Sequence, residues 1–143
     1  WERLFDLSAE GTSILVSTHY MDEAERCHGL AILEEGVKRA DGSPQALMAS
    51  MGARVFEIEE QLKGAMTVND QGHNLRTLKQ ALVEETAVLS AAQIGSRLRV
   101  LLRNDLADPL DWLSLRVAGR LFNEVRPSLE DVFVTCTGDR HVA

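Results

Sequence analysis

Short apolar runs and helically spaced apolar residues alternate along the first fifty positions of the chain. The opening residues place apolar side chains at helical spacing, at Trp1, Leu4, Phe5 and Leu7. They predict a short amphipathic helix that Gly11 can close. Residues 14–18 form an apolar, β-branched run, which predicts a strand covered on both faces, as in a parallel sheet. Residues 30–33 predict a second buried strand, and residues 37–40 predict its return as a hairpin.

Polar residues in the same part predict two helix starts. Residues 20–28 predict a short helix, and its acidic side chains Asp22, Glu23 and Glu25 suit the positive end of a helix dipole. Three carboxylates could also ligate a metal ion, but the dipole accounts for them more simply. The Ser-Pro pair at residues 43–44 supplies an N-cap and a first-turn proline for the second helix.

From residue 53 the pattern is typical of an antiparallel α+β unit. Alternation predicts strands at residues 54–60, 87–92, 97–103 and 121–126, and helical spacing predicts helices at residues 74–85 and 108–118. The order βαββαβ is that of the ferredoxin-like motif, in which two helices cover four antiparallel strands. Ser128, with Asp131 three residues later, predicts a closing helix through a capping-box-like pairing.

One of these strands separates its side chains clearly by face. Leucine and valine occupy alternate positions 98, 100 and 102, while Arg97, Arg99 and Arg103 fall on the other face. The arginine row could bind an anionic ligand, but a solvated sheet face is the simpler reading.

Composition and charge narrow the possible functions. The 143 residues suffice for one domain or two small ones. The net charge of −7 disfavours a nucleic-acid partner. The apolar runs fall far short of the ~20 residues of a membrane span, and no signal segment opens the chain. Cys27 and Cys136 form no paired motif, so we expect a reducing cytoplasm. The chain starts at Trp1 inside a helical pattern, so we expect a piece of a longer protein.

Motifs of nucleotide hydrolysis are missing from the sequence. A phosphate-binding loop needs a Gly-Lys pair, and the three lysines follow valine or leucine instead. No apolar strand ends in Asp-Glu, and there is no Gly-x-Ser-x-Gly elbow. Cys27 and His28 point about 100° apart on a helix, so a shared metal site is not expected. We expect His73 to be an ordinary exposed loop histidine.

One stretch stands out, Ser-Thr-His-Tyr-Met-Asp-Glu-Ala-Glu at residues 17–25, directly after a predicted buried strand. Ligands bind at the carboxyl ends of strands in open α/β sheets, and His19 occupies such an end. An imidazole there can donate a hydrogen bond to a terminal phosphate. Spacing alone also allows a loop histidine without a role.

This stretch resembles the switch-histidine region of ABC transporter ATP-binding subunits, and its Tyr-Met-Asp-Glu-Ala-Glu continuation is most similar to the drug and polysaccharide exporter branch. The Pro-Ser-Leu-Glu-Asp-Val-Phe run at residues 127–133 resembles the element that closes the C-terminal extension in that branch. The resemblance implies that His19 contacts the γ-phosphate of ATP in a dimer of two such subunits, and that the phosphate loop, signature and magnesium-binding strand precede residue 1.

The resemblance sets further expectations for the whole chain. Residues 1–52 would be an α/β remnant of an ABC ATPase nucleotide-binding domain, residues 53–138 a ferredoxin-like extension, and residues 139–143 a tail. The longer protein would use ATP and Mg²⁺, pair with a second ATP-binding subunit and a membrane permease, and work at the cytoplasmic face of the inner membrane. This chain alone would be inactive. The alternative is a non-enzymatic ferredoxin-like module that binds a small ligand or dimerises.

Overall fold

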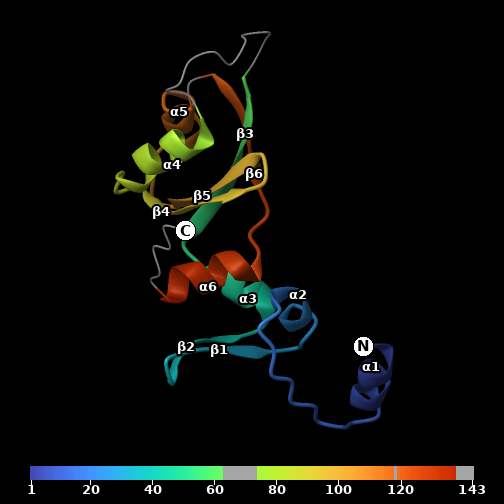
Figure 1. Ribbon diagram of the computed structural model, residues 1–143. Helices are drawn as coiled ribbons and strands as arrows, with labels where there is room; N and C mark the ends of the chain where they lie inside the picture. The colour runs from blue at the N-terminus through green and yellow to red at the C-terminus, as the bar shows by residue number, and fades with distance from the viewer. Residues whose placement is uncertain (63–73, 118, 138–143) are drawn as a thin grey trace.

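Two antiparallel sheets and the helices around them make up a mixed α/β fold (Figure 1). The structure, a computed structural model, describes residues 1–62, 74–117 and 119–137. The elements are α1 (Glu2–Ala9), α2 (Met21–Ala24), β1 (Leu30–Glu34), β2 (Val37–Gly42), α3 (Pro44–Ser50), β3 (Ala53–Leu62), α4 (Leu75–Val83), β4 (Val88–Ile94), β5 (Arg97–Arg103), α5 (Pro109–Ser114), β6 (Arg120–Val125) and α6 (Leu129–Thr137). The predictions for His73 and for the tail 139–143 lie outside the described residues.

The larger sheet has the strand order β4-β5-β3-β6, with every neighbouring pair antiparallel. β3 therefore lies between β5 and β6, and its Phe56 faces Val100 on one side and Glu124 on the other. The four predicted strands are present in the predicted chain order, although β3, β4 and β6 begin and end a residue or two from their expected positions.

Helices α4 and α5 cover one face of this sheet (Figure 1). Their contacts with it form a core of fully buried aliphatic and aromatic side chains, which include Phe56, Ile58, Leu75, Leu82, Leu98, Val100, Leu102 and Leu113. The expected division of β5 is confirmed on this side, because its leucine and valine residues at 98, 100 and 102 are completely buried. Strand alternation and helical spacing thus place the main core correctly.

The smaller sheet is the hairpin of β1 and β2. Its turn contains Glu35 and Gly36, both with positive φ, which is the backbone that tight hairpin turns favour. Helix α3 begins as predicted, since the Ser43 side chain accepts a hydrogen bond from the Ala46 N–H at 3.2 Å.

Helix α6 follows the larger sheet in sequence but packs with the first part of the chain. Leu129 and Val132 of α6 form a second buried cluster with Ile32 of β1 and Leu47 of α3. Figure 1 shows α6 and α3 side by side beneath the four-stranded sheet. A boundary near residue 52 stays a prediction, and α6 makes contacts on both sides of it.

The expected parallel sheet in the first part is wrong for the described residues. Residues 12–18 have no regular structure, and Leu15 is 99% exposed. β1 pairs with β2 in the antiparallel direction, and of its residues only Ile32 is buried. A buried strand needs covered faces and hydrogen-bonded neighbours, and the described chain gives residues 14–18 neither.

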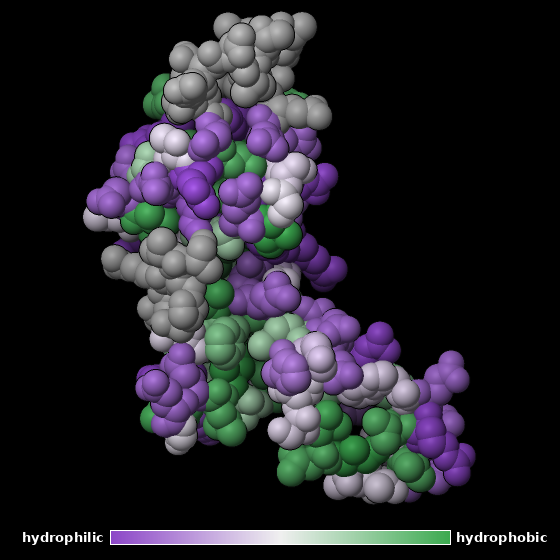
Figure 2. All heavy atoms as spheres, in the orientation of Figure 1, coloured by the Kyte–Doolittle hydropathy of each residue, from purple (hydrophilic) through white to green (hydrophobic). Residues whose placement is uncertain are grey.

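The uncovered positions leave an apolar surface near the N-terminus. Figure 2 shows hydrophobic side chains gathered over α1 and the segment that follows it. The exposed apolar residues there are Phe5, Ile14, Leu15 and Val16. α1 has no buried residue, and both ribbon views show it apart from the rest of the fold.

Shortening Leu98 tests the assignment of the main core. We expect Leu98→Ala to lower the free energy of unfolding by about 2–5 kcal/mol, because it removes buried methyl groups and leaves a cavity. Leu121→Ala on β6 is the matched control, since Leu121 is 42% exposed and its loss should change stability by less than about 0.5 kcal/mol. Urea unfolding followed by circular dichroism measures both, and equal effects would contradict the core described here.

Candidate functional site

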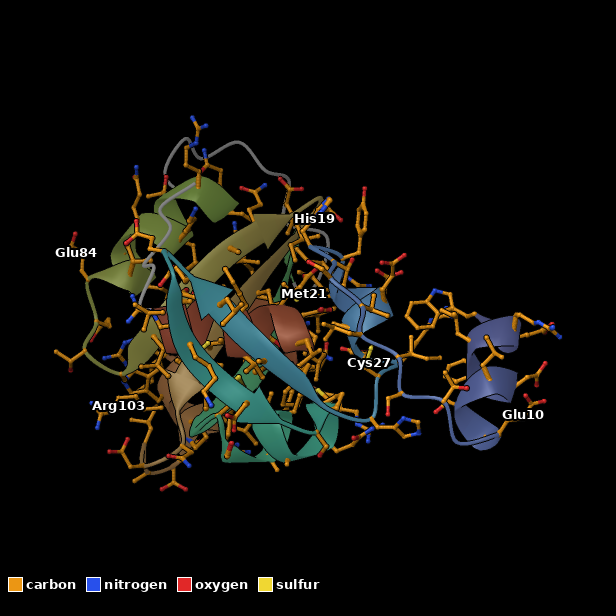
Figure 3. The ribbon with its side chains drawn as sticks, turned by 90° about the horizontal axis from the view of Figure 1, so that it is seen from below. Glu10, His19, Met21, Cys27, Glu84 and Arg103 are labelled. Carbon is orange, nitrogen blue, oxygen red and sulfur yellow. The ribbon has the colours of Figure 1, made fainter. Side chains whose placement is uncertain are left out.

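His19 lies in the loop that leads into α2, and its side chain is exposed (Figure 3). Its ring packs against that of the neighbouring Tyr20, with centroids 4.1 Å apart and planes tilted by 36°. The predicted placement after a buried strand is wrong, because residues 14–18 are not a strand here. The placement directly before a helix is confirmed.

A hydroxyl group holds this loop against α2. The Tyr20 N–H donates to Thr18 Oγ1 at 3.0 Å, and Thr18 Oγ1 donates in turn to Glu23 Oε2 at 2.6 Å. Thr18 and Glu23 flank His19, so the two bonds limit the conformations of the loop that carries the imidazole.

Glu25 has a different role from the one its position in the sequence suggested. α2 ends at Ala24, so Asp22 and Glu23 lie in its first turn, as expected, but Glu25 lies at its C-terminal end. Its Oε1 accepts a hydrogen bond from the Leu129 N–H at 3.2 Å, across 104 positions of sequence. Glu25 therefore connects α2 to the start of α6, a contact that no local pattern could indicate.

The capping box predicted for α6 is confirmed. Ser128 donates its N–H and its hydroxyl to Asp131 Oδ2, at 2.8 and 3.1 Å, and the Asp131 N–H donates back to Ser128 Oγ at 3.4 Å. Asp131 is 4% exposed, so its carboxylate is held away from water.

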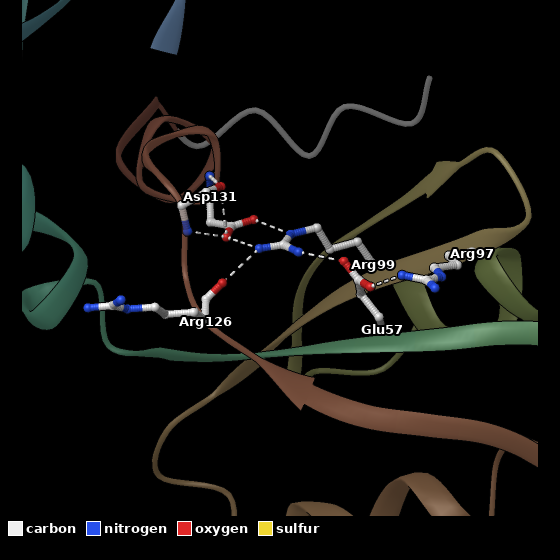
Figure 4. Close-up of polar contacts among 6 residues, drawn as sticks. Glu57, Arg97, Arg99, Arg126 and Asp131 are labelled. Carbon is white, nitrogen blue, oxygen red and sulfur yellow. Dashed lines mark hydrogen bonds and ion pairs between the residues drawn. The ribbon is translucent and has the colours of Figure 1, made fainter. Parts of the chain in front are cut away.

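Arg99 of β5 neutralises this buried carboxylate (Figure 4). Its Nε and Nη2 donate to the two oxygens of Asp131, at 2.9 and 2.7 Å. Nη2 also donates to the Arg126 carbonyl at 3.1 Å, and Nη1 to Glu57 Oε1 at 2.8 Å. The hydrogen bonds to Asp131 raise the pKa of the Arg99 guanidinium, while its partial burial acts in the opposite direction.

The arginine row is therefore divided. The Arg97 and Arg103 side chains are 57% and 53% exposed, as a solvated face predicts. The Arg99 side chain is only 15% exposed, so that reading is wrong for Arg99. The pattern along β5 gave the face of Arg99 but not the helix that covers it. The capping box predicted for α6 indicates an acid at Asp131, but nothing in the local pattern indicates that this acid is buried or that it pairs with Arg99.

Neither a metal site nor a disulfide appears in the part of the chain that the structure describes. No three His, Cys, Asp or Glu side chains among these residues gather to hold a metal ion. Cys27 and Cys136 are free thiols, and burial raises the pKa of the Cys136 thiol above its ordinary value. Within the same ranges no helix is long and apolar enough to cross a membrane.

Comparison of the sequence with known proteins finds similarity to export ATP-binding proteins. Nod factor export ATP-binding protein I of Rhizobium sp. (strain N33) is 35% identical over 143 aligned residues, which cover 96% of this chain and 41% of that protein. The protein of the same name from Paraburkholderia xenovorans (strain LB400) is 57% identical over 60 residues, or 41% of this chain and 20% of that protein. The chain is homologous to part of these export proteins.

The similarity has clear limits. The chain spans about two fifths of the Rhizobium protein, and a Bradyrhizobium protein (strain SNU001) of the same name gives the same identity and coverage. No family model matches the sequence, and no solved structure matches it. By name these relatives bind ATP and serve in Nod factor export.

Replacing Thr18 tests whether its hydroxyl orders the His19 loop. We expect Thr18→Val to speed hydrogen exchange at the Tyr20 amide and to lower stability by about 0.5–1.5 kcal/mol, because the variant keeps the shape and loses both hydrogen bonds. Ser17→Ala, at an exposed neighbouring position, should leave the Tyr20 amide unchanged. An unchanged Tyr20 amide in Thr18→Val, measured by NMR, would show that the loop does not depend on the hydroxyl.

Proposed function

We propose that this chain is the C-terminal part of the ATP-binding subunit of an ABC-type exporter, and that His19 contacts the terminal phosphate of ATP there. The observation that carries the proposal is the His-Tyr-Met-Asp-Glu-Ala-Glu motif at residues 19–25, in a chain homologous over 96% of its length to an export ATP-binding protein. The exposed imidazole, in a loop tied to α2, is free to donate to a ligand in solvent.

We assign residues 1–52 to the nucleotide-binding domain and residues 53–138 to a ferredoxin-like extension. The extension is supported by the order β6-β3-β5-β4, all antiparallel, with α4 and α5 over one face. The exposed apolar residues of the first part support a role as one piece of a larger α/β layer.

The residues present fit a sensing role for His19 better than a binding role. One imidazole supplies one hydrogen bond, whereas a triphosphate needs several donors and cations. The loop around His19 is acidic, and residues 1–52 hold 4 basic and 9 acidic side chains, for a net charge of −5. Residues of the longer protein would hold the phosphates and Mg²⁺, and ATP would supply the phosphoryl group for hydrolysis.

The partners follow from the same proposal. A second ATP-binding subunit would close the site over ATP, and a membrane permease would carry the exported molecule. Both place the protein at the cytoplasmic face of the inner membrane. The similarity to Nod factor export proteins favours export within the drug and polysaccharide branch.

A second function has one observation in its favour. The four-stranded sheet has its own buried core, distinct from the cluster around α3 and α6, which suits a separate ligand-binding or dimerising module. The reading frame of the longer protein distinguishes the two. A Gly-x-x-x-x-Gly-Lys-Ser/Thr loop upstream supports the ATPase, and its absence supports the module.

ATP binding by the isolated chain is the first test. We expect a dissociation constant of about 1 mM or weaker for Mg-ATP, because the sequence contains no Gly-Lys phosphate loop. Isothermal titration of the folded chain measures it. Affinity tighter than about 100 µM would mean that this chain has a nucleotide site of its own.

Replacing His19 in the longer protein tests its role directly. We expect His19→Ala to lower ATP turnover by about 10²–10³, because the hydrogen bond strengthens as charge develops on the phosphate. Nucleotide affinity should change far less. His28→Ala, a histidine outside the motif, is the control, and wild-type turnover in His19→Ala would refute the assignment.

A further inference from the structure

Two side-chain hydrogen bonds and the α2 backbone between them join the His19 loop to α6. Thr18 binds Glu23 of α2 at 2.6 Å, and the α2 backbone continues to Glu25, whose N–H donates to Met21 O at 2.9 Å. The Glu25 carboxylate then accepts the Leu129 N–H. The path crosses from the first part of the chain to the last helix without a gap.

On its far side, the start of α6 is held by the four-stranded sheet. Arg99 donates hydrogen bonds to both carboxylate oxygens of Asp131 and to the Arg126 carbonyl, and it also forms an ion pair with Glu57 of β3 (Figure 4). Asp131 in turn holds the Ser128 N–H. The first backbone donors of α6 thus have acceptors that are fixed by two different regions of the molecule.

We propose that Glu25 and Arg99 are positioning residues that together fix the His19 loop relative to the four-stranded sheet, with the N-terminus of α6 as the junction. The junction itself is a property of the described chain. Its consequence for ATP turnover rests on the proposed function of His19.

The physical basis is that the start of α6 is bonded on two sides. If α6 moved with the sheet, the hydrogen bond to Glu25 would break, and if it stayed with α2, the contacts with Arg99 would break. Free N–H groups at a helix start need acceptors, and a buried group left without one is unfavourable. Leu129 and Val132, 1% and 3% exposed, keep α6 packed on the first part of the chain. A shift of the sheet that carries Arg99 along would therefore be passed to α2 through Leu129 and Glu25.

A control residue lies on the same strand. Arg97 also pairs with Glu57, at 3.1 Å, but its side chain is 57% exposed and this ion pair lies within the sheet. Arg99→Lys and Arg97→Lys both keep the positive charge and lose the planar fork. Only the first should affect α6.

The experiment is amide NMR on the whole 143-residue chain without nucleotide. In Arg99→Lys we expect the amides of Ala24, the last residue of α2, and of Glu25, its C-cap, to shift and to exchange about tenfold faster or more. Arg97→Lys should leave both amides unchanged. If Arg99→Lys perturbs only β3, β5 and residues 126–131, the junction does not reach α2 and the proposal is overturned.

A second experiment tests whether a change at Glu25 reaches Arg99. Glu25→Ala should shift the Arg99 Nε–H signal, whereas Glu25→Gln, which keeps an acceptor oxygen, should restore it. An Arg99 Nε–H signal that is unchanged in Glu25→Ala would equally overturn the proposal. This test can be made even if Arg99→Lys fails to fold. Because no arm contains ATP, a failed junction leaves the His19 assignment untouched, and a failed His19→Ala test leaves the junction untouched.

Discussion

The first N–H groups of a helix have no backbone acceptor within it, and the arrangement of this chain depends on how those at the start of α6 are satisfied. Asp131 satisfies one of them from within the helix, and Glu25 satisfies another from α2. A buried carboxylate needs a counter-charge, and Arg99 supplies it from the sheet. Three regions that are distant in sequence therefore meet at the start of α6. The helix provides N–H donors and a buried carboxylate, α2 provides an acceptor at Glu25, and the sheet provides the cation of Arg99.

The sequence predicted the elements whose cause is local. Alternation along β5 and helical spacing in α4 identified the main core, and the caps at Ser43 and Ser128 were confirmed in detail. These features depend on residues a few positions apart, so a pattern is sufficient to find them. The candidate site stays a prediction, and only the position of His19, in a contiguous motif directly before α2, is confirmed.

The wrong predictions share one physical origin. Each concerns whether a residue is covered by a segment that is distant in the sequence. Residues 14–18 have the composition of a buried strand, yet Leu15 is 99% exposed. Composition shows that a segment is suited to burial, but it does not show which other segments cover it. Arg99 shows the opposite case, in which a residue expected in water is covered by α6. Glu25 likewise acts through a contact 104 positions away. Long-range cover of this kind has no local signal.

Charge separates the two roles that a histidine could have near a nucleotide. Residues 1–52 carry a net charge of −5, so the field around the His19 loop repels a polyanion and does not gather it. One imidazole in such surroundings contributes little to capture, but it can still donate to a phosphate whose charge other groups have neutralised. The acidic surroundings therefore favour a group that responds to nucleotide already bound. A responding group is useful only if its position is defined, which makes the bonds from Thr18 to Glu23 and from Glu25 to Leu129 as relevant to the proposed function as the imidazole itself.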